Sequence, residues 1–325
     1  MRYITTGAVL LSLICLAGCG GSGSGSSGSG GAKSGALEIA VIPKGLSHQF
    51  WLGVKAGAEA AAAECGASVV WQGPPKETEI AQQINIVQDM ITRGVSAIVM
   101  AACDENALGA VIAQADRAGI PVVMVDSGVK SDIPKSLVAT DNLEGAKMAA
   151  RVLADLMGGQ GELGLLPFIS GAATSEIRER GFKEGVTEFP GMKIVATNYT
   201  QSDVSTGMNV TSDMLTAHPD LGGIFATNEP GAIGAAQALR AAGKAGKVKL
   251  VGFDATEEEI NALKEGVIQA LIVQDPFKMG YEGVKAAVAS LKGEEVPPII
   301  DTGVTVVTLE NLESPEVQKL LNTGK

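Results

Sequence analysis

From residue 37 onward, short apolar runs alternate with longer Ala-rich stretches of helical spacing. The runs LEIAVI (37–42), SAIVMA (96–101) and PVVMVD (121–126) are apolar throughout, which is typical of strands buried on both faces. Helices are expected between such runs, among them residues 50–64 and 77–94. Strands that alternate with helices predict parallel βαβ units, so the chain is expected to be an α/β protein built on doubly wound parallel sheets.

This strand–helix pattern runs through the chain twice. A first series ends with the run SLVAT (136–140), and a second begins with a helical stretch at 141–157. The strands expected in the second series lie at 162–168, 192–199, 222–227, 249–254 and 268–274. After a last helix, an extended segment at 304–312 can cross between the two sheets.

The repeat predicts two parallel-sheet lobes. The N-terminal lobe is expected to comprise residues 37–139 plus 275–302, and the C-terminal lobe residues 140–274 plus 303–325. In doubly wound sheets, ligands bind beyond the carboxyl ends of the strands. Two lobes whose carboxyl edges face each other would therefore form a ligand cleft between them.

The first 18 residues are typical of an export signal rather than of the fold. Arg2 supplies a positive start, and the apolar run from Ala8 to Ala17 is too short to cross a bilayer as a stable helix. The run ends in LAGC, which resembles the bacterial lipobox and implies cleavage before Cys19 and attachment of lipid to that cysteine. The alternative is a simple secretory signal that a cysteine happens to follow.

A Gly/Ser-rich segment follows Cys19 and extends to residue 35. Such a composition cannot bury apolar surface and forms a flexible tether, about 20–24 Å long on average. Residues 19–35 are thus expected to hold a folded protein above a membrane by a lipid anchor. No other apolar run is long enough to span a bilayer, so the remainder is expected to be soluble and extracytoplasmic, in the periplasm or at the cell surface.

Charge and cysteine content narrow the classes of partner. The formal net charge of -11 argues against a nucleic acid or an anionic membrane surface, because both would repel the chain. Cys65 and Cys103 have no CxxC spacing and no histidine beside them, so neither a metal site nor a cofactor is expected. Whether these two cysteines form a disulfide or stay as free thiols is left open by the sequence.

Two further motifs carry no catalytic chemistry. The sequence GQGELG at 159–164 spells GxGxxG, but it follows a helix and opens a strand, the reverse of a phosphate-binding loop, and is predicted to be a turn. The chain has only two histidines, His48 and His218, and no nucleophile-elbow motif. The sequence therefore does not show the catalytic residues typical of a hydrolase.

Polar and aromatic side chains recur directly after the predicted strands. They are Lys44, His48, Phe50 and Trp51 after the first strand, and Asp126, Ser127, Asn228, Asp254 and Gln274 after later ones. Any single Asp or Asn at such a place is explained equally well by capping of the next helix. Their recurrence at five strand ends, together with an aromatic pair in a chain with 4% aromatic residues, favours a polar ligand site.

The order and spacing of several stretches resemble the ribose-type family of periplasmic sugar-binding proteins. These stretches are VQDMITRGVSAIVM, AGIPVVMVDS, LTAHPDLGGIFATNE, GAIGAAQALRAAGKAG, VGFDATEE and IQALIVQDPFKMGYEGV. The resemblance implies that Phe50 and Trp51 cover a sugar ring. It also implies polar contacts to the sugar from Asp126, Arg178, Asn228, Asp254 and Gln274.

The sequence departs from that family at several places. Ser127 stands where pentose-binding members have arginine, and Lys44 and His48 stand where small polar residues are usual. Lys44 or His48 could meet an acidic group on the ligand, or Lys44 could be a solvated side chain on the lip of the cleft. These differences leave the identity of the sugar open.

The resemblance implies capture rather than catalysis. The expected function is that of a monomeric, lipid-anchored solute-binding protein that closes its lobes around a sugar or polyol and delivers it to the permease of an ABC transporter. Two alternatives remain at this point: a sensory module of the same fold that signals to a membrane receptor or kinase, and an enzyme on the same scaffold.

Overall fold

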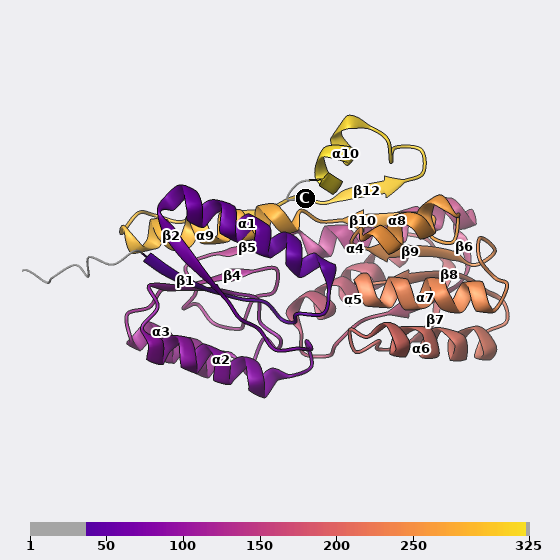
Figure 1. The fold of residues 1–325 in the computed structure, drawn as a ribbon. Helices are drawn as coiled ribbons and strands as arrows, with labels where there is room; N and C mark the ends of the chain where they lie inside the picture. Colours follow the sequence, from indigo (N-terminus) through magenta and orange to yellow (C-terminus); the bar gives the residue numbers. More distant parts are fainter. Residues whose placement is uncertain (1–36, 323–325) are drawn as a thin grey trace, which may run out of the picture. The chain divides into compact units, whose positions relative to one another are not determined.

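The computed structural model describes residues 37–322 and contains two six-stranded sheets (Figure 1). The predicted signal, the predicted lipidation site at Cys19 and the predicted tether lie outside the described residues. The first sheet has the order β11-β5-β4-β3-β1-β2, with all pairs parallel. Its strands are β1 (Leu37–Ile42), β2 (Ala67–Trp71), β3 (Ala97–Met100), β4 (Val122–Val125), β5 (Leu137–Ala139) and β11 (Ile299–Asp301).

The second sheet has the matching order β12-β10-β9-β8-β6-β7. Its strands are β6 (Gln160–Leu166), β7 (Gly191–Thr197), β8 (Leu221–Ala226), β9 (Lys249–Phe253), β10 (Ala270–Val273) and β12 (Thr305–Thr308). All pairs are parallel except β12, which runs antiparallel to β10 along the edge. The structure confirms the α/β class with two parallel-sheet lobes.

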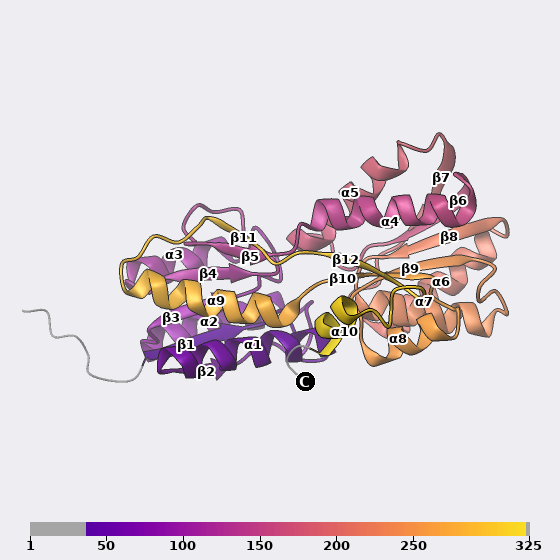
Figure 2. The same ribbon diagram turned by 90° about the horizontal axis from the view of Figure 1, so that it is seen from above.

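Helices cover both faces of each sheet, as expected for doubly wound sheets (Figure 2). The first sheet is covered on one face by α1 (Gln49–Cys65) and α9 (Pro276–Leu291), and on the other by α2 (Ile80–Arg93) and α3 (Gly109–Arg117). The second sheet is covered on one face by α4 (Asn142–Met157) and α5 (Ala173–Val186), and on the other by α6 (Val204–Ala217), α7 (Glu229–Ala241), α8 (Glu257–Lys264) and α10 (Pro315–Asn322).

The chain passes between the two sheets three times: from β5 to α4, from β10 to α9, and from β11 to β12. The last of these connections is the crossing that the sequence predicted for the C-terminal segment. Each connection is only two or three residues long, and a few loop residues of this kind suit a hinge between two lobes.

Two glycines allow the long helices of the first lobe to touch backbone to backbone. A Cβ added at Gly57 of α1 would lie 1.9 Å from the carbonyl oxygen of Phe277, and one added at Gly280 of α9 would lie 1.9 Å from that of Val54. Any larger residue would force these helices apart. Helix α1 begins at the rim of the cleft, so this packing fixes the position of the residues at its N-terminus.

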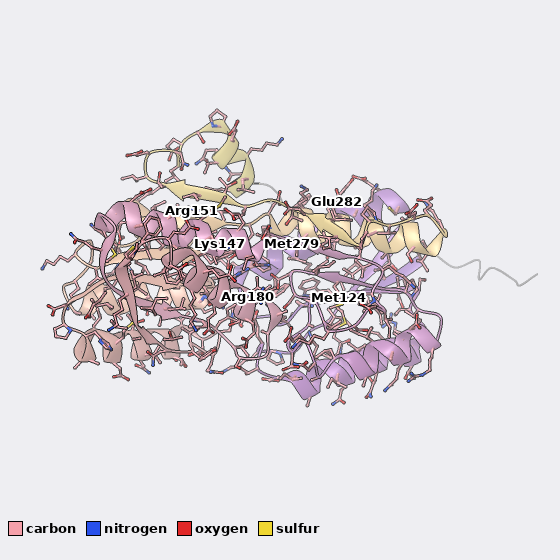
Figure 3. The ribbon with its side chains drawn as sticks, turned by 180° about the vertical axis from the view of Figure 1, so that it is seen from behind. Met124, Lys147, Arg151, Arg180, Met279 and Glu282 are labelled. Carbon is pink, nitrogen blue, oxygen red and sulfur yellow. The ribbon has the colours of Figure 1, made fainter. Side chains whose placement is uncertain are left out.

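The outer surface of α4 and α5 carries charged side chains that pair with each other (Figure 3). Lys147 lies 2.9 Å from Glu184, and Arg151 lies 3.7 Å from Glu188. Exposed pairs of this kind contribute little to stability, so they indicate a solvated face. None of the helices within residues 37–322 combines the length and the apolar character that crossing a membrane would require.

The structure differs from the sequence predictions in three places. The helix expected at 77–94 begins only at Ile80, because Glu77 turns its carboxylate into the cleft instead of joining the first helical turn. The segment expected to be extended over 304–312 is a strand only to Thr308. Strand β11 and helix α10 were not predicted. Cys65 and Cys103 are both free thiols, which settles the question left open above.

Candidate functional site

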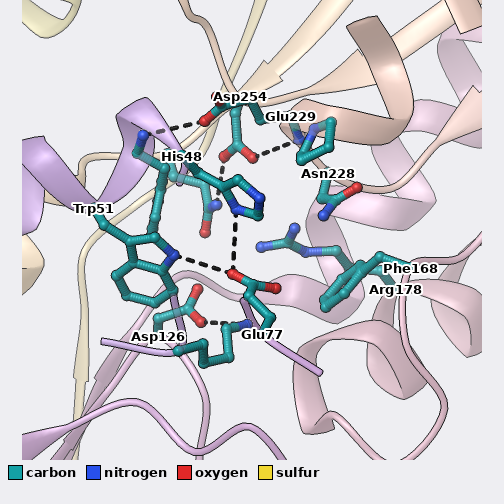
Figure 4. A pocket seen from close by; sticks show the side chains of 13 residues that line it. His48, Trp51, Glu77, Asp126, Phe168, Arg178, Asn228, Glu229 and Asp254 are labelled. Carbon is teal, nitrogen blue, oxygen red and sulfur yellow. Dashed lines mark hydrogen bonds and ion pairs between the residues drawn. The ribbon is translucent and has the colours of Figure 1, made fainter. Parts of the chain in front are cut away.

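A cavity lies where the two sheets present the carboxyl ends of their strands (Figure 4). Both lobes contribute to its wall, and nine of its thirteen lining residues are polar or charged. The lining residues are Lys44, His48, Phe50, Trp51, Glu77, Asp126, Phe168, Arg178, Asn228, Glu229, Pro230, Asp254 and Gln274.

Lys44 and Phe168 reach the cavity from equivalent places in the two lobes. Each stands two residues after the end of a strand, with a proline between: Pro43 after β1 and Pro167 after β6. The Lys44 Nζ lies 5.0 Å from the centre of the Phe168 ring and 5.7 Å from that of Trp51. The ammonium therefore lies near two aromatic faces, where cation–π attraction stabilises it.

Lys44 is a buried, paired cation. The side chain is 4% exposed, and its Nζ lies 2.9 Å from Asp126 Oδ2 and donates to Thr174 Oγ1 at 3.1 Å. Burial disfavours the charged form, but Asp126 and Glu77 outweigh it and raise the pKa of Lys44. The idea of a solvated lysine on the cleft lip is wrong, because the neighbouring carboxylates draw the ammonium into the interior.

The amide of Gln83 fixes the segment that carries Lys44. Gln83 is fully buried in α2, and its Nε2 donates to the carbonyl oxygens of Pro43 and Ala101, at 3.0 and 2.7 Å. Its Oε1 accepts from the amide of Cys103 at 2.9 Å. One side chain thus joins the turns that follow β1 and β3, and it satisfies three backbone groups that would otherwise be buried without partners.

Glu77 collects three donors at the wall that the first lobe forms, here called the near wall, and Figure 4 shows the contacts from Trp51 and His48. Its Oε1 accepts from the indole N–H of Trp51 at 3.0 Å and lies 3.4 Å from Nδ1 of His48, and its Oε2 accepts from the hydroxyl of Ser202 at 2.8 Å. Burial opposes the charged carboxylate, but Lys44 and His48 hold the pKa of Glu77 well below its usual range. Glu77 is therefore an ionised carboxylate that orients Trp51.

His48 links the two lobes at the rim. Its Nε2 lies 3.2 Å from the carbonyl oxygen of Ser202, in the second lobe, while its Nδ1 faces Glu77 in the first. Burial lowers the pKa of His48, but the hydrogen bond and charge of Glu77, with the charge of Glu229, raise it overall. The geometry favours the protonated imidazolium, in which both ring nitrogens donate.

Phe50 and Trp51 belong partly to the core and partly to the cavity. Their ring centres are 4.9 Å apart with the planes at 86°, an edge-to-face pair, and Trp51 is 2% exposed. Both rings pack in the first lobe between α1 and the sheet, and both also line the cavity. The pair is thus a rigid part of the wall rather than a freely moving cover.

Arg178 is held in place by groups of the protein itself. Its Nε donates to Asn142 Oδ1 and its Nη1 to the carbonyl oxygen of Thr227, each at 2.7 Å, and its Cζ lies 3.6 Å from the centre of the Phe253 ring. Burial lowers the pKa of Arg178, against the charges of Asp254 and Asp126. Arginine stays protonated even so, and its planar shape fixes its outer amino group toward the cavity.

The wall opposite Glu77, here called the far wall, is acidic and is formed by Asp254, Glu229 and Gln274. Asp254 Oδ1 accepts from Gln274 Nε2 at 2.7 Å, and its Oδ2 accepts from the backbone N–H of Glu229 at 3.1 Å. The carboxylate of Glu229 crosses the cleft and accepts from the backbone N–H groups of Gln49 and Phe50, at 3.2 and 3.1 Å. Burial raises the pKa of both Glu229 and Asp254.

The cavity brings together nine of the ten predicted site residues. Ser127 is the exception: it does not line the cavity, and its hydroxyl lies 3.5 Å from Thr174 Oγ1 behind the wall. Helix capping was the alternative explanation for each polar residue at a strand end. It applies to Asn228, whose Oδ1 accepts from the N–H of Gly231. Asn228 also lines the cavity. Asp126 and Asp254 do not cap the helices that follow them in the sequence, which Asp141 and Thr256 cap instead.

Sequence reasoning missed four lining residues: Glu77, Phe168, Glu229 and Pro230. Phe168 ends a predicted strand and Glu229 follows Asn228, so the rule that found the other residues also points to these two. Within residues 37–322, no group of three or more His, Cys, Asp or Glu side chains could hold a metal ion.

Residues 39–295 match the family model described as periplasmic binding protein domain. The chain belongs to this family. One relative of the family is the D-ribose/D-allose-binding protein of Pseudomonas aeruginosa, 34% identical over 283 residues, which cover 83% of this chain and 88% of the relative.

Solved structures of similar solute-binding proteins support the same family assignment. The solute-binding protein of an ABC transporter from Agrobacterium vitis, with bound D-fucose, is 38% identical, with a TM-score of 0.84 over 86% of this chain and 98% of that one. A carbohydrate transporter solute-binding protein from Agrobacterium radiobacter, in complex with D-arabinose, is 35% identical, with a TM-score of 0.86 over 89% of this chain and 100% of that one. These relatives bind solutes for transport, which favours the same role here over signalling.

Proposed function

We propose that this chain captures one sugar or sugar-like polyol in the interlobe cavity and delivers it to the permease of an ABC transporter. The observation that carries the proposal is the convergence of carboxylates, an arginine and aromatic rings from both lobes on a single cavity. The similar proteins named above, described as binding ribose or allose, or with D-fucose or D-arabinose bound, support a carbohydrate ligand.

The wall suits the chemistry of a sugar. The faces of Trp51 and Phe168 meet the apolar C–H surface of a ring at little cost in side-chain entropy. Asp126, Asp254 and Arg178 offer charged hydrogen bonds to hydroxyl groups, and such bonds are stronger than neutral ones. A sugar of the wrong stereochemistry would leave one of these buried groups unpaired, which is the basis of discrimination.

Cross-lobe contacts give a mechanism for retention. Lys44 reaches Thr174, His48 reaches Ser202, and Glu229 reaches the first turn of α1. A ligand that contacts both walls adds to these contacts only when the lobes are closed. It therefore shifts the population toward the closed form, which would present its surface to the permease. The protein binds its ligand without chemical change and needs no cofactor.

The location follows from the N-terminus. The protein acts outside the cytoplasm, as a monomer, and lipid on Cys19 anchors it to a membrane through the Gly/Ser tether of residues 20–35. Mass spectrometry of the N-terminal peptide purified from native membranes tests this anchor. A mature chain that begins elsewhere, or an unmodified Cys19, would contradict it.

Trp51 provides the test of binding. A Trp71→Phe variant leaves Trp51 as the single tryptophan, since the chain has two. Its fluorescence and the thermal unfolding temperature are measured against pentoses, hexoses, deoxy sugars, alditols and sugar acids. The correct sugar should change both signals and be recovered chemically unchanged after prolonged incubation. No response to any member of the panel by either method would overturn the proposal.

A further inference from the structure

The cavity wall carries more negative than positive charge. Its four carboxylates are Glu77, Asp126, Glu229 and Asp254, and its permanent cations are Lys44 and Arg178. The formal net charge of the lining is therefore -2 when His48 is neutral and -1 when His48 is protonated. A neutral sugar leaves this imbalance unchanged, and an acidic sugar adds to it.

The imbalance has a defined position. Lys44 lies 2.9 Å from Asp126 and also faces Glu77, so both near-wall carboxylates share one buried cation. His48, when protonated, adds positive charge that both Glu77 and Glu229 face. At the far wall, Arg178 faces Asp254, but its Nε and Nη1 are bound to Asn142 and Thr227. Glu229 is paired with backbone N–H groups and with no lysine or arginine among the described residues.

Some hydrogen-bond donors on the wall are used by the protein itself. The indole N–H of Trp51 donates to Glu77, one amide N–H of Asn228 donates to Ser202, and one amide N–H of Gln274 donates to Asp254. The second N–H of each amide and the outer amino group of Arg178 remain for acceptors on a ligand.

Acceptors also remain free at the far wall. The Oε1 of Gln274 is buried and has no hydrogen-bond partner in the described part of the chain, and Gln274 itself is 3% exposed. Each carboxylate oxygen of Asp254 and Glu229 accepts one bond from the protein, and such an oxygen can accept about two. A buried acceptor without a donor is costly, so this wall favours a ligand rich in donors.

We propose that the ligand is an amino sugar or amino polyol whose protonated amine lies against Glu229, Asp254 and Gln274. An ammonium group is a donor in all three of its N–H bonds and carries the positive charge that this wall lacks. Burial raises the pKa of both Glu229 and Asp254, and a bound cation would favour their ionised forms. This inference rests on the proposed function, because it names the class of sugar that the same cavity takes.

Matched sugars isolate the effect of the charge. Glucosamine is compared with glucose, galactosamine with galactose and mannosamine with mannose, at about pH 6, where the amine is protonated. Within each pair the stereochemistry is the same and one hydroxyl is replaced by ammonium. N-acetylated amino sugars serve as neutral controls of similar substitution, and uronic acids as anionic controls. Dissociation constants are measured by titration calorimetry.

In at least one pair, the amino sugar should bind about tenfold tighter than the neutral sugar, because its hydrogen bonds are charge-assisted. Its N-acetyl form should lose that advantage. The variants Glu229→Gln and Asp254→Asn keep the shape of the side chain and should reduce the ratio of the two affinities. Glu257→Gln removes an exposed carboxylate that does not line the cavity, so it should leave the ratio unchanged.

The outcomes separate the two proposals. If a neutral sugar binds as tightly as its amino counterpart, or tighter, in every pair, the preference for amines is overturned and sugar capture stands. A ratio that falls equally in Glu257→Gln would assign the preference to the overall acidity of the protein and would also overturn the inference. If no member of any pair binds, the proposed function fails and this inference fails with it.

Discussion

Asp126 and Asp254 occupy equivalent positions in the two lobes and share an unusual backbone conformation. Each directly follows the strand that lies third from the β11 or β12 edge of its sheet, β4 or β9. Each also has a positive φ, of 56° at Asp126 and 84° at Asp254. Left-handed geometry is uncommon outside glycine, though Asp and Asn tolerate it better than most residues. The two strand ends thus turn in the same way and direct their carboxylates into one cavity from opposite sides.

Substitutions at Asp254 should separate backbone strain from ligand chemistry. Asp254→Ala should lower the free energy of unfolding by about 1 kcal/mol relative to Asp254→Gly, because a Cβ is disfavoured at positive φ. Both variants should lose ligand binding. Urea denaturation and calorimetry measure the two effects. Equal stability of the alanine and glycine variants would show that the conformation carries no strain.

Lys44 and Asp126 should be strongly coupled. Removing one partner leaves the other as an uncompensated charge at a buried site, whereas replacing both with neutral groups of similar shape does not. The losses in free energy of unfolding of the single variants Lys44→Met and Asp126→Asn should therefore add up to more than the loss in the double variant. The coupling energy expected for residues in contact is about 1–3 kcal/mol. A cycle of urea denaturations measures it, and strict additivity would contradict the buried pair.

His48 should make stability depend on pH above its ordinary pKa of 6.5. Glu77 and Glu229 raise the pKa of His48 in the folded protein, so the folded state binds the proton more tightly than the unfolded state does. The stabilisation is full below about pH 6.5 and is lost as the pH rises through the folded pKa. The His48→Gln variant should lose this dependence, and His218→Gln should keep it. NMR titration is simple, because the chain has two histidines.

Strands buried on both faces were predictable, and strand β11 was not. Continuous apolar runs such as residues 121–126 carry their own signal, because a parallel strand covered by helices must be apolar throughout. Strand β11 has the sequence IID, and its Ile299 is 69% exposed. Only pairing with β5 makes it a strand, and that partner lies far away in the sequence.

The site was predictable where a polar residue directly follows a strand. Asp126, Asp254 and Asn228 all obey that rule. Glu77 does not, since its sequence context equally fits the first turn of a helix, and only the folded chain reveals the bonds from Trp51 and Ser202 that draw it into the cleft. In the same way, composition cannot predict that Lys44 is buried, because its partners come from distant segments.

Gly57 should not tolerate alanine. Its Cβ would lie 1.9 Å from the carbonyl oxygen of Phe277, so α1 and α9 would have to separate. The expected loss for such overpacking is about 1–3 kcal/mol. Gly109→Ala is the matched control: it also lies in a helix, its Cβ would meet no atom within 4 Å, and it should be neutral or stabilising. Thermal unfolding distinguishes the two, and an equal response would refute the close contact.

Glu229 should stabilise the closed form by capping a helix of the other lobe. The N-cap residue of α1, His48, makes no side-chain capping bond, and the carboxylate of Glu229 takes that role across the cleft. Glu229→Ala should therefore cost about 1 kcal/mol in the closed form alone, which weakens ligand binding about fivefold through the lost cap. Any further loss would come from direct contact between Glu229 and the ligand.

A cap within a single lobe separates closure from folding. Ser314 caps α10 by accepting from the N–H of Val317 at 3.3 Å, and it neither lines the cavity nor lies in a connection between the lobes. Ser314→Ala should lower the free energy of unfolding by a similar amount and leave the affinity for ligand unchanged. Small-angle scattering should also show more open molecules in the Glu229→Ala variant than in wild type, with no such shift in Ser314→Ala. Equal affinity of wild type and Glu229→Ala would mean that the cross-lobe cap contributes nothing to closure.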